Sequence, residues 1–251
     1  MLLTVDVGNT NTVLGVFDGE RLEESFRIKT DARDTADEMA LVYRGLLRDH
    51  EISGVCACSS VPAVQAALRL MFQRYYAAIP TVIIEPGVHT GVPLLYDNPR
   101  EIGPDRIMNT LAAHHLYGGP CVVVDFGTST NFDVVGPGGE FLGGALAPGI
   151  ELSVDALASR GARLFKVELT TPRSVIAKST VEALQSGILY GFAGQVDGLV
   201  RRISAELGAA PTVIATGGLA GLAIAESETI QRHEPDLTLI GLRLAFERNV
   251  G

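Results

Sequence analysis

Two short stretches of this chain combine the residue types that bind phosphate and metal ions. The first, at residues 6–11, reads Asp-Val-Gly-Asn-Thr-Asn and follows an apolar run that starts at Leu2. Gly8 and Asn9 tolerate the positive φ of a tight turn, and such a turn points backbone N–H groups at one spot, where a phosphate can bind. The neighbouring carboxylate of Asp6 can hold Mg²⁺ directly or through bound water. Taken alone, the stretch is equally compatible with an ordinary surface hairpin.

The second stretch repeats the arrangement of the first. An apolar run at 121–124 leads into Asp125-Phe126-Gly127-Thr128-Ser129-Thr130, and a further run through Val135 follows. The repetition of a strand, an Asp-x-Gly turn and another strand indicates a duplicated domain. We therefore expect two acidic turns that face one cleft.

A third polar stretch, at residues 96–106, combines turn formers with a tyrosine, acids and arginines. In a substrate loop, Asp105 can act as a general base and Arg106 can bind an anionic group. The alternative is that Asp105 only caps the helix expected over 107–117, because aspartate is favoured at helix N-termini. The residues alone leave both interpretations open.

Composition narrows the class of protein. The chain has 251 residues, of which 47% are hydrophobic, which is enough for the packed cores of two domains. Its net charge of −9 argues against nucleic acid or an anionic membrane surface as the main partner. No lysine lies in a glycine-rich phosphate loop. Phosphate binding would then depend on backbone N–H groups, hydroxyls, arginine and metal.

The cysteines and the apolar segments indicate a cytoplasmic protein. Cys56, Cys58 and Cys121 are best interpreted as buried reduced thiols, which suit a reducing cytosol. No basic segment precedes an apolar one at the N-terminus, so a signal peptide is not expected. The uncharged stretch 207–225 contains Pro211 and several glycines, and therefore predicts a strand, a turn and a helix instead of a membrane span.

Hydrophobic periodicity predicts strands and helices that alternate after an initial hairpin, as in mixed sheets covered by helices. Thr35-Ala36-Asp37-Glu38 forms a capping box, which marks the start of the first helix. Pro148 precedes another helix start, and Ser179-Thr180 begins a long helix that runs to about Glu206. Further strands are expected at 21–28, 54–58, 81–84, 131–135 and 213–216, and a further helix at 63–76.

The two Asp-x-Gly turns and a late Thr-Gly-Gly resemble the acetate and sugar kinase, Hsp70 and actin superfamily. Within it, the chain resembles the type III pantothenate kinases, the first enzymes of coenzyme A synthesis. The resemblance covers nearly the whole length, although Ser129 stands where the family more often has alanine. The matching motifs are Asp-Val-Gly-Asn-Thr-Asn at 6–11, Ser-Ser-Val-Pro at 59–62, Tyr-x-Asn-Pro at 96–99, Gly-Pro-Asp-Arg at 103–106, Asp-Phe-Gly-Thr at 125–128, Gly-Gly-x-x-x-Pro-Gly at 143–149, Thr180, and Thr-Gly-Gly at 216–218.

The resemblance implies an α/β fold of two actin-like (ribonuclease H-like) domains, each a mixed β-sheet flanked by helices. We expect these domains at residues 1–118 and 119–251, with the active site in the cleft between them. The implied reaction is ATP-dependent phosphorylation of pantothenate to 4'-phosphopantothenate. Two alternatives remain open: a phosphotransferase or phosphohydrolase of the same superfamily that acts on another small molecule, and a non-catalytic regulator that binds nucleotide. The acidic balance and the intact Asp105-Arg106 pair count against the regulator.

The resemblance also implies a role for individual residues. Asp105 would be the catalytic base, Asp6 would lie near Mg²⁺, and Asp125 would hold a monovalent cation, K⁺ or NH₄⁺. Thr180 would reach the substrate from the partner subunit of a homodimer. The implied ATP-binding residues are Asp6, Val7, Gly8, Asn9, Thr10, Asn11, Thr12, Val13 and Thr128, and the implied pantothenate-binding residues are Tyr96, Gly103, Pro104, Asp105, Arg106 and Thr180.

Overall fold

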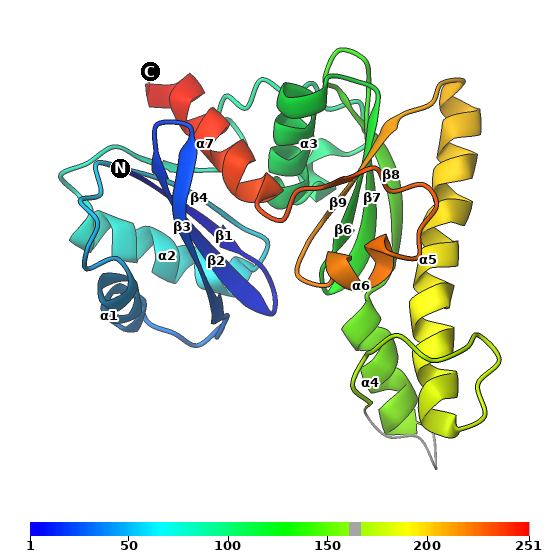
Figure 1. Ribbon diagram of the computed structural model, residues 1–251. Coiled ribbons are helices and arrows are strands. Elements are labelled where there is room, and N and C mark those ends of the chain that lie inside the picture. The colour runs from blue at the N-terminus through cyan, green and yellow to red at the C-terminus, as the bar shows by residue number, and fades with distance from the viewer. Residues whose placement is uncertain (161–166, 251) are drawn as a thin grey trace. The chain divides into compact units, whose positions relative to one another are not determined.

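The computed structural model describes residues 1–160 and 167–250, which form two compact units (Figure 1). Unit 1 contains Met1–Pro93, Asp97–Ala112 and the segment that begins at Leu237. Unit 2 contains Leu94–Tyr96 and Ala113–Asp236. The chain therefore leaves unit 1, forms unit 2, and then returns to unit 1.

Unit 1 is built on a five-stranded mixed sheet with the strand order β3-β2-β1-β4-β5. The central strand β1 is antiparallel to β2 and parallel to β4. The elements are β1 (Leu2–Val7), β2 (Asn11–Asp18), β3 (Arg21–Lys29), α1 (Ala36–Leu46), β4 (Gly54–Ser59), α2 (Pro62–Tyr75), β5 (Thr81–Ile83), the 3₁₀ turn η1 (Pro99–Glu101), α3 (Pro104–Tyr117), whose last turn belongs to unit 2, and α7 (Leu237–Val250).

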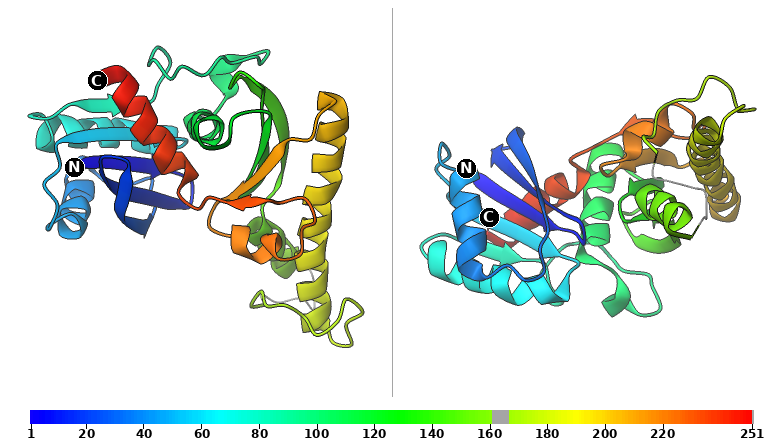
Figure 2. Two further views of the ribbon diagram at one scale, coloured as in Figure 1. Left: turned by 45° about the horizontal axis from the view of Figure 1, so that its top comes forward. Right: turned by 90° about the horizontal axis from the view of Figure 1, so that it is seen from below.

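The two faces of the unit 1 sheet carry different side chains, because successive residues of a strand point to opposite faces. Leu3, Val5 and Val7 of β1 pack into a core with side chains of α1 and α2. The intervening residues Thr4 and Asp6 belong to the other face. Helix α7 contacts β1, β2 and β4, as Figure 2 shows. The strand alternation thus separates an apolar core from the face that carries an acidic residue.

Helix α7 also fixes the position of α3. A Cβ atom at Gly241 would lie 2.1 Å from the carbonyl oxygen of Met108, so the two helix backbones touch where glycine removes the side chain. Close by, the Thr238 hydroxyl donates a 2.7 Å hydrogen bond to Oδ1 of Asn109. Both Met108 and Asn109 follow Asp105 within α3. The C-terminal helix therefore helps to hold the start of α3 in place.

Unit 2 repeats the plan of unit 1 on a sheet with the order β10-β9-β6-β7-β8. Its central strand β6 is antiparallel to β7 and parallel to β9, as β1 is to β2 and β4. Helix α5 contacts α4 and α6 and contributes Ile188, Phe192 and Val196 to the core (Figure 2). The elements are β6 (Cys121–Phe126), β7 (Ser129–Val135), β8 (Phe141–Pro148), α4 (Ile150–Arg160), α5 (Thr180–Leu207), β9 (Thr212–Thr216), α6 (Ala220–Ile224) and β10 (Arg232–His233).

The duplicated mixed-sheet fold predicted from the sequence is confirmed. The division of the chain differs from the expected ranges 1–118 and 119–251 in two respects. Unit 2 takes Leu94–Tyr96 and then the chain from Ala113 inside α3, and α7 belongs to unit 1 because it packs against β1, β4 and α3. Among the described residues, no helix has both the length and the apolar character that a bilayer crossing requires.

Candidate active site

The turn between β1 and β2 forms without the backbone conformation expected for it. Gly8 is not among the glycines with positive φ, and no other residue type in the described chain has a positive φ. The Gly8 N–H instead donates a 3.0 Å hydrogen bond to the carbonyl oxygen of Asn11. A Cβ at Gly8 would lie 3.1 Å from that oxygen, a tight contact that a larger residue could make only with a small shift of the turn. Asn9 and Thr10 are exposed and accessible to a ligand.

Asp6 lies near the end of the central strand β1 and is paired with Val13 of β2 and Cys58 of β4. The Cys58 thiol donates a hydrogen bond to Oδ1 of Asp6, with 3.3 Å between sulfur and oxygen. Burial, and then the nearby carboxylate of Asp105, raises the pKa of Asp6 to about 7. Asp6 is therefore close to a second acid and ionises only near neutral pH.

Asp105 lies in the first turn of α3, and its Oδ1 atom is buried without a hydrogen-bond partner among the described residues. Burial raises the pKa of Asp105, while a hydrogen bond from the Arg106 backbone and the charge of Arg106 act in the opposite direction. A Cβ at Gly103 would lie 2.3 Å from this Oδ1 atom, so Gly103 leaves room for the carboxylate. The capping interpretation explains the backbone hydrogen bond, but it does not explain a buried oxygen without a partner.

The carboxylates of Asp6 and Asp105 are suited to bind a divalent cation or to accept a proton. Asp105 raises the pKa of Asp6, and a positive charge bound nearby would favour the ionised form of both acids. Carboxylate oxygens are preferred Mg²⁺ ligands, and Mg²⁺ is usually held by one or two carboxylates together with substrate phosphates. The described residues contain no group of three or more His, Cys, Asp or Glu side chains arranged as metal ligands. Asp6 and Asp105 are a pair of acids that could supply ligands to such an ion together with the phosphates of a substrate.

Unit 2 places Asp125 on β6 where unit 1 places Asp6 on β1. Asp125 is paired with Asn131 on β7 and with Thr216 on β9. Gly217 has a φ of +90°, and a Cβ there would lie 2.5 Å from Oδ1 of Asp125. The Thr-Gly-Gly sequence thus allows the end of β9 to approach the aspartate closely. Thr128 is exposed in the turn after β6, and its carbonyl oxygen accepts a 3.1 Å hydrogen bond from the Gly149 N–H.

The remaining predicted site residues fall in both units. Gly103, Pro104 and Arg106 lie beside Asp105 in unit 1, and Arg106 is buried. Tyr96 belongs to unit 2, where its ring packs edge-on against Phe141 with 5.8 Å between the centroids. Thr180 is exposed at the first position of α5, next to the N-cap residue Ser179.

One residue near these acids was not anticipated as part of a site. The sequence predicts a buried reduced thiol at Cys58, and the structure confirms that Cys58 is buried and forms no disulfide. Its contact with Asp6 depends on the parallel register of β1 and β4, which joins residues 52 positions apart. No local sequence signal reports that register.

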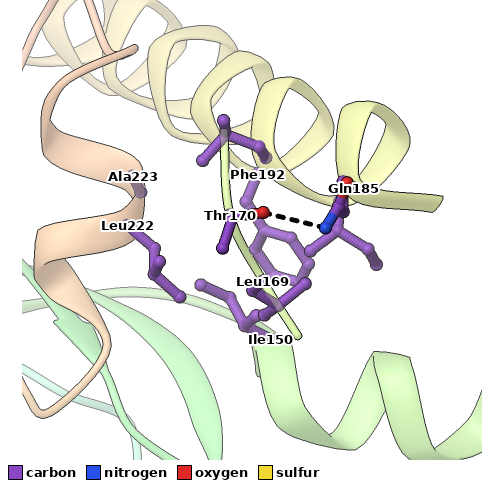
Figure 3. Close-up of a pocket in the computed structure, with 9 residues that line it drawn as sticks. Ile150, Leu169, Thr170, Gln185, Phe192, Leu222 and Ala223 are labelled. Carbon is purple, nitrogen blue, oxygen red and sulfur yellow. Dashed lines mark hydrogen bonds between the residues drawn. The ribbon is translucent and has the colours of Figure 1, made fainter. Parts of the chain in front are cut away.

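A small pocket in unit 2 is a packing feature. Figure 3 shows Ile150, Leu169 and Phe192 around it, with a 2.9 Å hydrogen bond from Gln185 to the Thr170 hydroxyl. Its volume of about 10 Å³ corresponds to roughly one water molecule. The pocket is too small for a nucleotide or a substrate.

Comparison with known proteins identifies the family. The family model described as type III pantothenate kinase matches residues 2–202. A type III pantothenate kinase of Frankia alni is 69% identical, and the alignment covers 100% of both chains.

Solved structures at lower identity support the fold. A Campylobacter jejuni protein described as a Baf-family transcriptional activator has a TM-score of 0.63 at 18% identity, covering 98% of both chains. The ROK hexokinase of Thermus thermophilus has a TM-score of 0.52 at 15% identity, covering 97% of both chains. These likenesses concern the actin-like fold alone. The sequence relationships are stronger, and by them the chain belongs to the type III pantothenate kinase family.

Proposed function

We propose that this protein transfers the γ-phosphoryl group of ATP to the primary hydroxyl of pantothenate, and that Asp105 accepts the hydroxyl proton. Membership of the family supports the reaction, which yields 4'-phosphopantothenate for coenzyme A synthesis and uses ATP with a divalent metal. The observation that supports the role of Asp105 is its buried Oδ1 atom, which has no hydrogen-bond partner in the part of the chain that the structure describes. A substrate hydroxyl would supply that partner.

The surroundings of Asp105 suit a general base. A base works best when its pKa lies near the operating pH, because it then takes up a proton readily while remaining largely ionised. Burial moves the pKa of Asp105 in that direction, and the charge of Arg106 limits the change. Arg106 is itself buried, and we assign to it the binding of an anionic group of pantothenate. Tyr96, Gly103, Pro104 and Thr180 complete the proposed pantothenate-binding set.

The β1–β2 turn is the proposed phosphate-binding element. Its exposed residues and its backbone N–H groups would face the ATP phosphates. Asp6 would hold the Mg²⁺ that accompanies ATP, and this ion neutralises charge on the transferring phosphoryl group when it is bound. The proposed ATP-binding residues remain Asp6, Val7, Gly8, Asn9, Thr10, Asn11, Thr12, Val13 and, from unit 2, Thr128.

A monovalent cation, K⁺ or NH₄⁺, is assigned to Asp125. The support is the position of Asp125 on β6, equivalent to that of Asp6 on β1, together with the close approach that Gly217 permits. The carboxylate supplies a hard oxygen donor, which suits such an ion. We further infer a cytoplasmic location, which the buried free cysteines support. Fractionation of cells that express a tagged chain would test the location.

Asparagine at position 105 tests the proposed reaction. Asp105→Asn keeps the size of the side chain but removes the base, so we expect the rate of phosphopantothenate formation to fall about 10²–10⁴-fold. Product would be identified by mass, and the urea denaturation curve would establish that the variant is folded. Wild-type turnover of another alcohol in preference to pantothenate would reject the proposed acceptor. An unchanged rate in folded Asp105→Asn would reject the proposed base and leave the acceptor intact.

A homodimer in which Thr180 acts across subunits is tested by mixing two inactive variants. Thr180 is exposed at the start of α5 and available to a second chain. If Thr180 serves the partner's site, a mixed dimer of Thr180→Ala and Asp105→Asn contains one intact site. Random pairing would then restore about a quarter of the wild-type activity. Mixed subunits that remain inactive would place Thr180 and Asp105 of the same chain in one site, or exclude Thr180 from the site.

A further inference from the structure

The thiol of Cys58 lies close to the two acids of unit 1, Asp6 and Asp105. Cys58 is fully buried in β4 and directly beside Asp6 in the parallel pairing of β1 and β4. Its sulfur lies 3.3 Å from Oδ1 of Asp6 and donates a hydrogen bond to it. The proposed phosphoryl transfer makes no use of a thiol, so this contact needs a separate explanation.

The alternation of β4 explains why a thiol points toward Asp6. Val55 and Ala57 belong to the core formed with α1 and α2. Cys56 and Cys58 occupy the intervening positions and therefore point to the opposite face, where Asp6 also lies. Cys56 is equally buried but is paired with Thr4 instead of an acid. The two cysteines thus differ in the residue that each faces on β1, which is an acid only for Cys58.

The Cys58 thiol is a donor in this environment. The ordinary pKa of a thiol is about 8.5, so a thiol is largely protonated at neutral pH. The sulfur therefore keeps its proton, and that proton points to the Asp6 carboxylate. A hydrogen bond to one oxygen of a carboxylate restricts rotation of the group and fixes the direction of the other oxygen.

We propose that Cys58 is a positioning residue for Asp6, whose S–H group fixes the carboxylate so that its other oxygen can bind the divalent cation that accompanies the nucleotide. This inference rests on the proposed function, since it concerns the ion that Asp6 is assigned there. Partners that orient metal ligands commonly change metal affinity by about 10–100-fold when they are removed. A thiol is a weak donor, so we expect a change near the lower limit, about tenfold.

Binding of Mn²⁺ in the presence of ADP provides a test that does not depend on catalysis. Free Mn²⁺ would be followed by electron paramagnetic resonance while the full chain is titrated. We expect Cys58→Ala to weaken Mn²⁺ binding about tenfold. Cys58→Ser keeps an O–H donor and should remain within about threefold of the wild type. Cys56→Ala is the matched control, because it removes an equally buried thiol of the same strand, and it should leave Mn²⁺ binding unchanged.

Three outcomes would overturn the proposal: equal weakening in Cys58→Ala and Cys56→Ala, equal weakening in Cys58→Ser and Cys58→Ala, or no weakening at all. Urea denaturation of each variant would establish that the fold persists. If Cys58→Ala does not fold, Cys58→Val restores the volume without a donor and should show the same tenfold loss. Because the assay contains no pantothenate, the result stands whether or not pantothenate is the acceptor. If the proposed phosphorylation of pantothenate is wrong, the product assay with wild-type protein will show no phosphopantothenate, whatever the result of the Mn²⁺ titration.

Discussion

Replacement of Asp6 by asparagine is expected to stabilise the ligand-free protein at alkaline pH. In the folded chain the pKa of Asp6 is about 7, compared with an ordinary value of 3.8. Between these values the folded state holds a proton that the unfolded state has released. The free energy of unfolding therefore falls as the pH rises from about 4 to about 7, and stays level above that. Asparagine is neutral at every pH and removes this loss.

The structure gives the size of the effect. The two pKa values differ by about 3, and at about 1.4 kcal/mol for each tenfold change the full cost of ionising Asp6 is about 4 kcal/mol. Roughly half of this cost, about 2.3 kcal/mol, arises between pH 5 and pH 7. Part of the Asp6 side chain is exposed to solvent, so water screens some of the repulsion between Asp6 and Asp105. We expect the stability difference between variant and wild type to grow by about 2 kcal/mol from pH 5 to pH 8.

Urea denaturation at both pH values, with a chelator present, would measure this difference. The slope of the free energy against urea should be the same for both proteins, so that midpoints can be compared. Asp18→Asn at the end of β2 is the matched control, because Asp18 is exposed and its replacement removes the same charge. Its effect should be equal at the two pH values. A difference for Asp6→Asn that does not grow with pH would show that the burial and the neighbouring Asp105 do not act on Asp6 as described.

Three further changes test other parts of the structure. Gly241→Ala should lower the free energy of unfolding by about 2–3 kcal/mol, since the new Cβ would meet the Met108 carbonyl oxygen at 2.1 Å. Gly45 has open space around it, so Gly45→Ala should change the free energy of unfolding by less than about 1 kcal/mol. Equal urea midpoints for the two variants would contradict the described helix contact. Asp197→Ala should lower the free energy of unfolding by about 2–4 kcal/mol in the same assay, because buried Asp197 accepts hydrogen bonds from the Ser227 hydroxyl at 2.7 Å and the Thr229 N–H at 3.1 Å. A loss below about 0.5 kcal/mol would show that water replaces the Asp197 carboxylate as the acceptor. Asp125→Asn should raise the K⁺ concentration needed for half-maximal phosphorylation, and a wild-type rate that is the same without K⁺ would remove the monovalent cation from Asp125.

Elements that depend on local chemistry were predictable from the sequence. The capping box at Thr35 is present, since the Thr35 hydroxyl accepts from the Glu38 N–H at 3.3 Å and Glu38 accepts from the Thr35 N–H at 2.9 Å. Ser179 caps α5 as expected, and the repeated Asp-x-Gly turns do follow the central strand of each sheet. In each case the signal lies within a few residues, where side-chain chemistry decides the structure without reference to the rest of the chain.

Features that depend on distant pairing were not predictable. The glycine-rich sequence of β8 is typical of a loop, but it forms a strand that pairs with β7, in which Gly143 and Gly144 have positive φ. The return of α7 to unit 1 requires contacts with β1 and β4, which lie near the other end of the chain. At the candidate site, Asp6 and Asp105 were both singled out, but the Cys58 contact was missed because it arises from strand register.

The division of unit 1 into separated chain segments has a consequence for synthesis. The ribosome makes residues 113–236, which form most of unit 2, before it makes the helix that begins at Leu237. Because domains generally fold as units during translation, unit 2 can complete its core while unit 1 still lacks α7. Until α7 emerges, the sheet face that carries Asp6 and the start of α3 lack their cover. The nascent chain thus acquires its acidic pair before unit 2 is made, and the helix that holds α3 in place only after it.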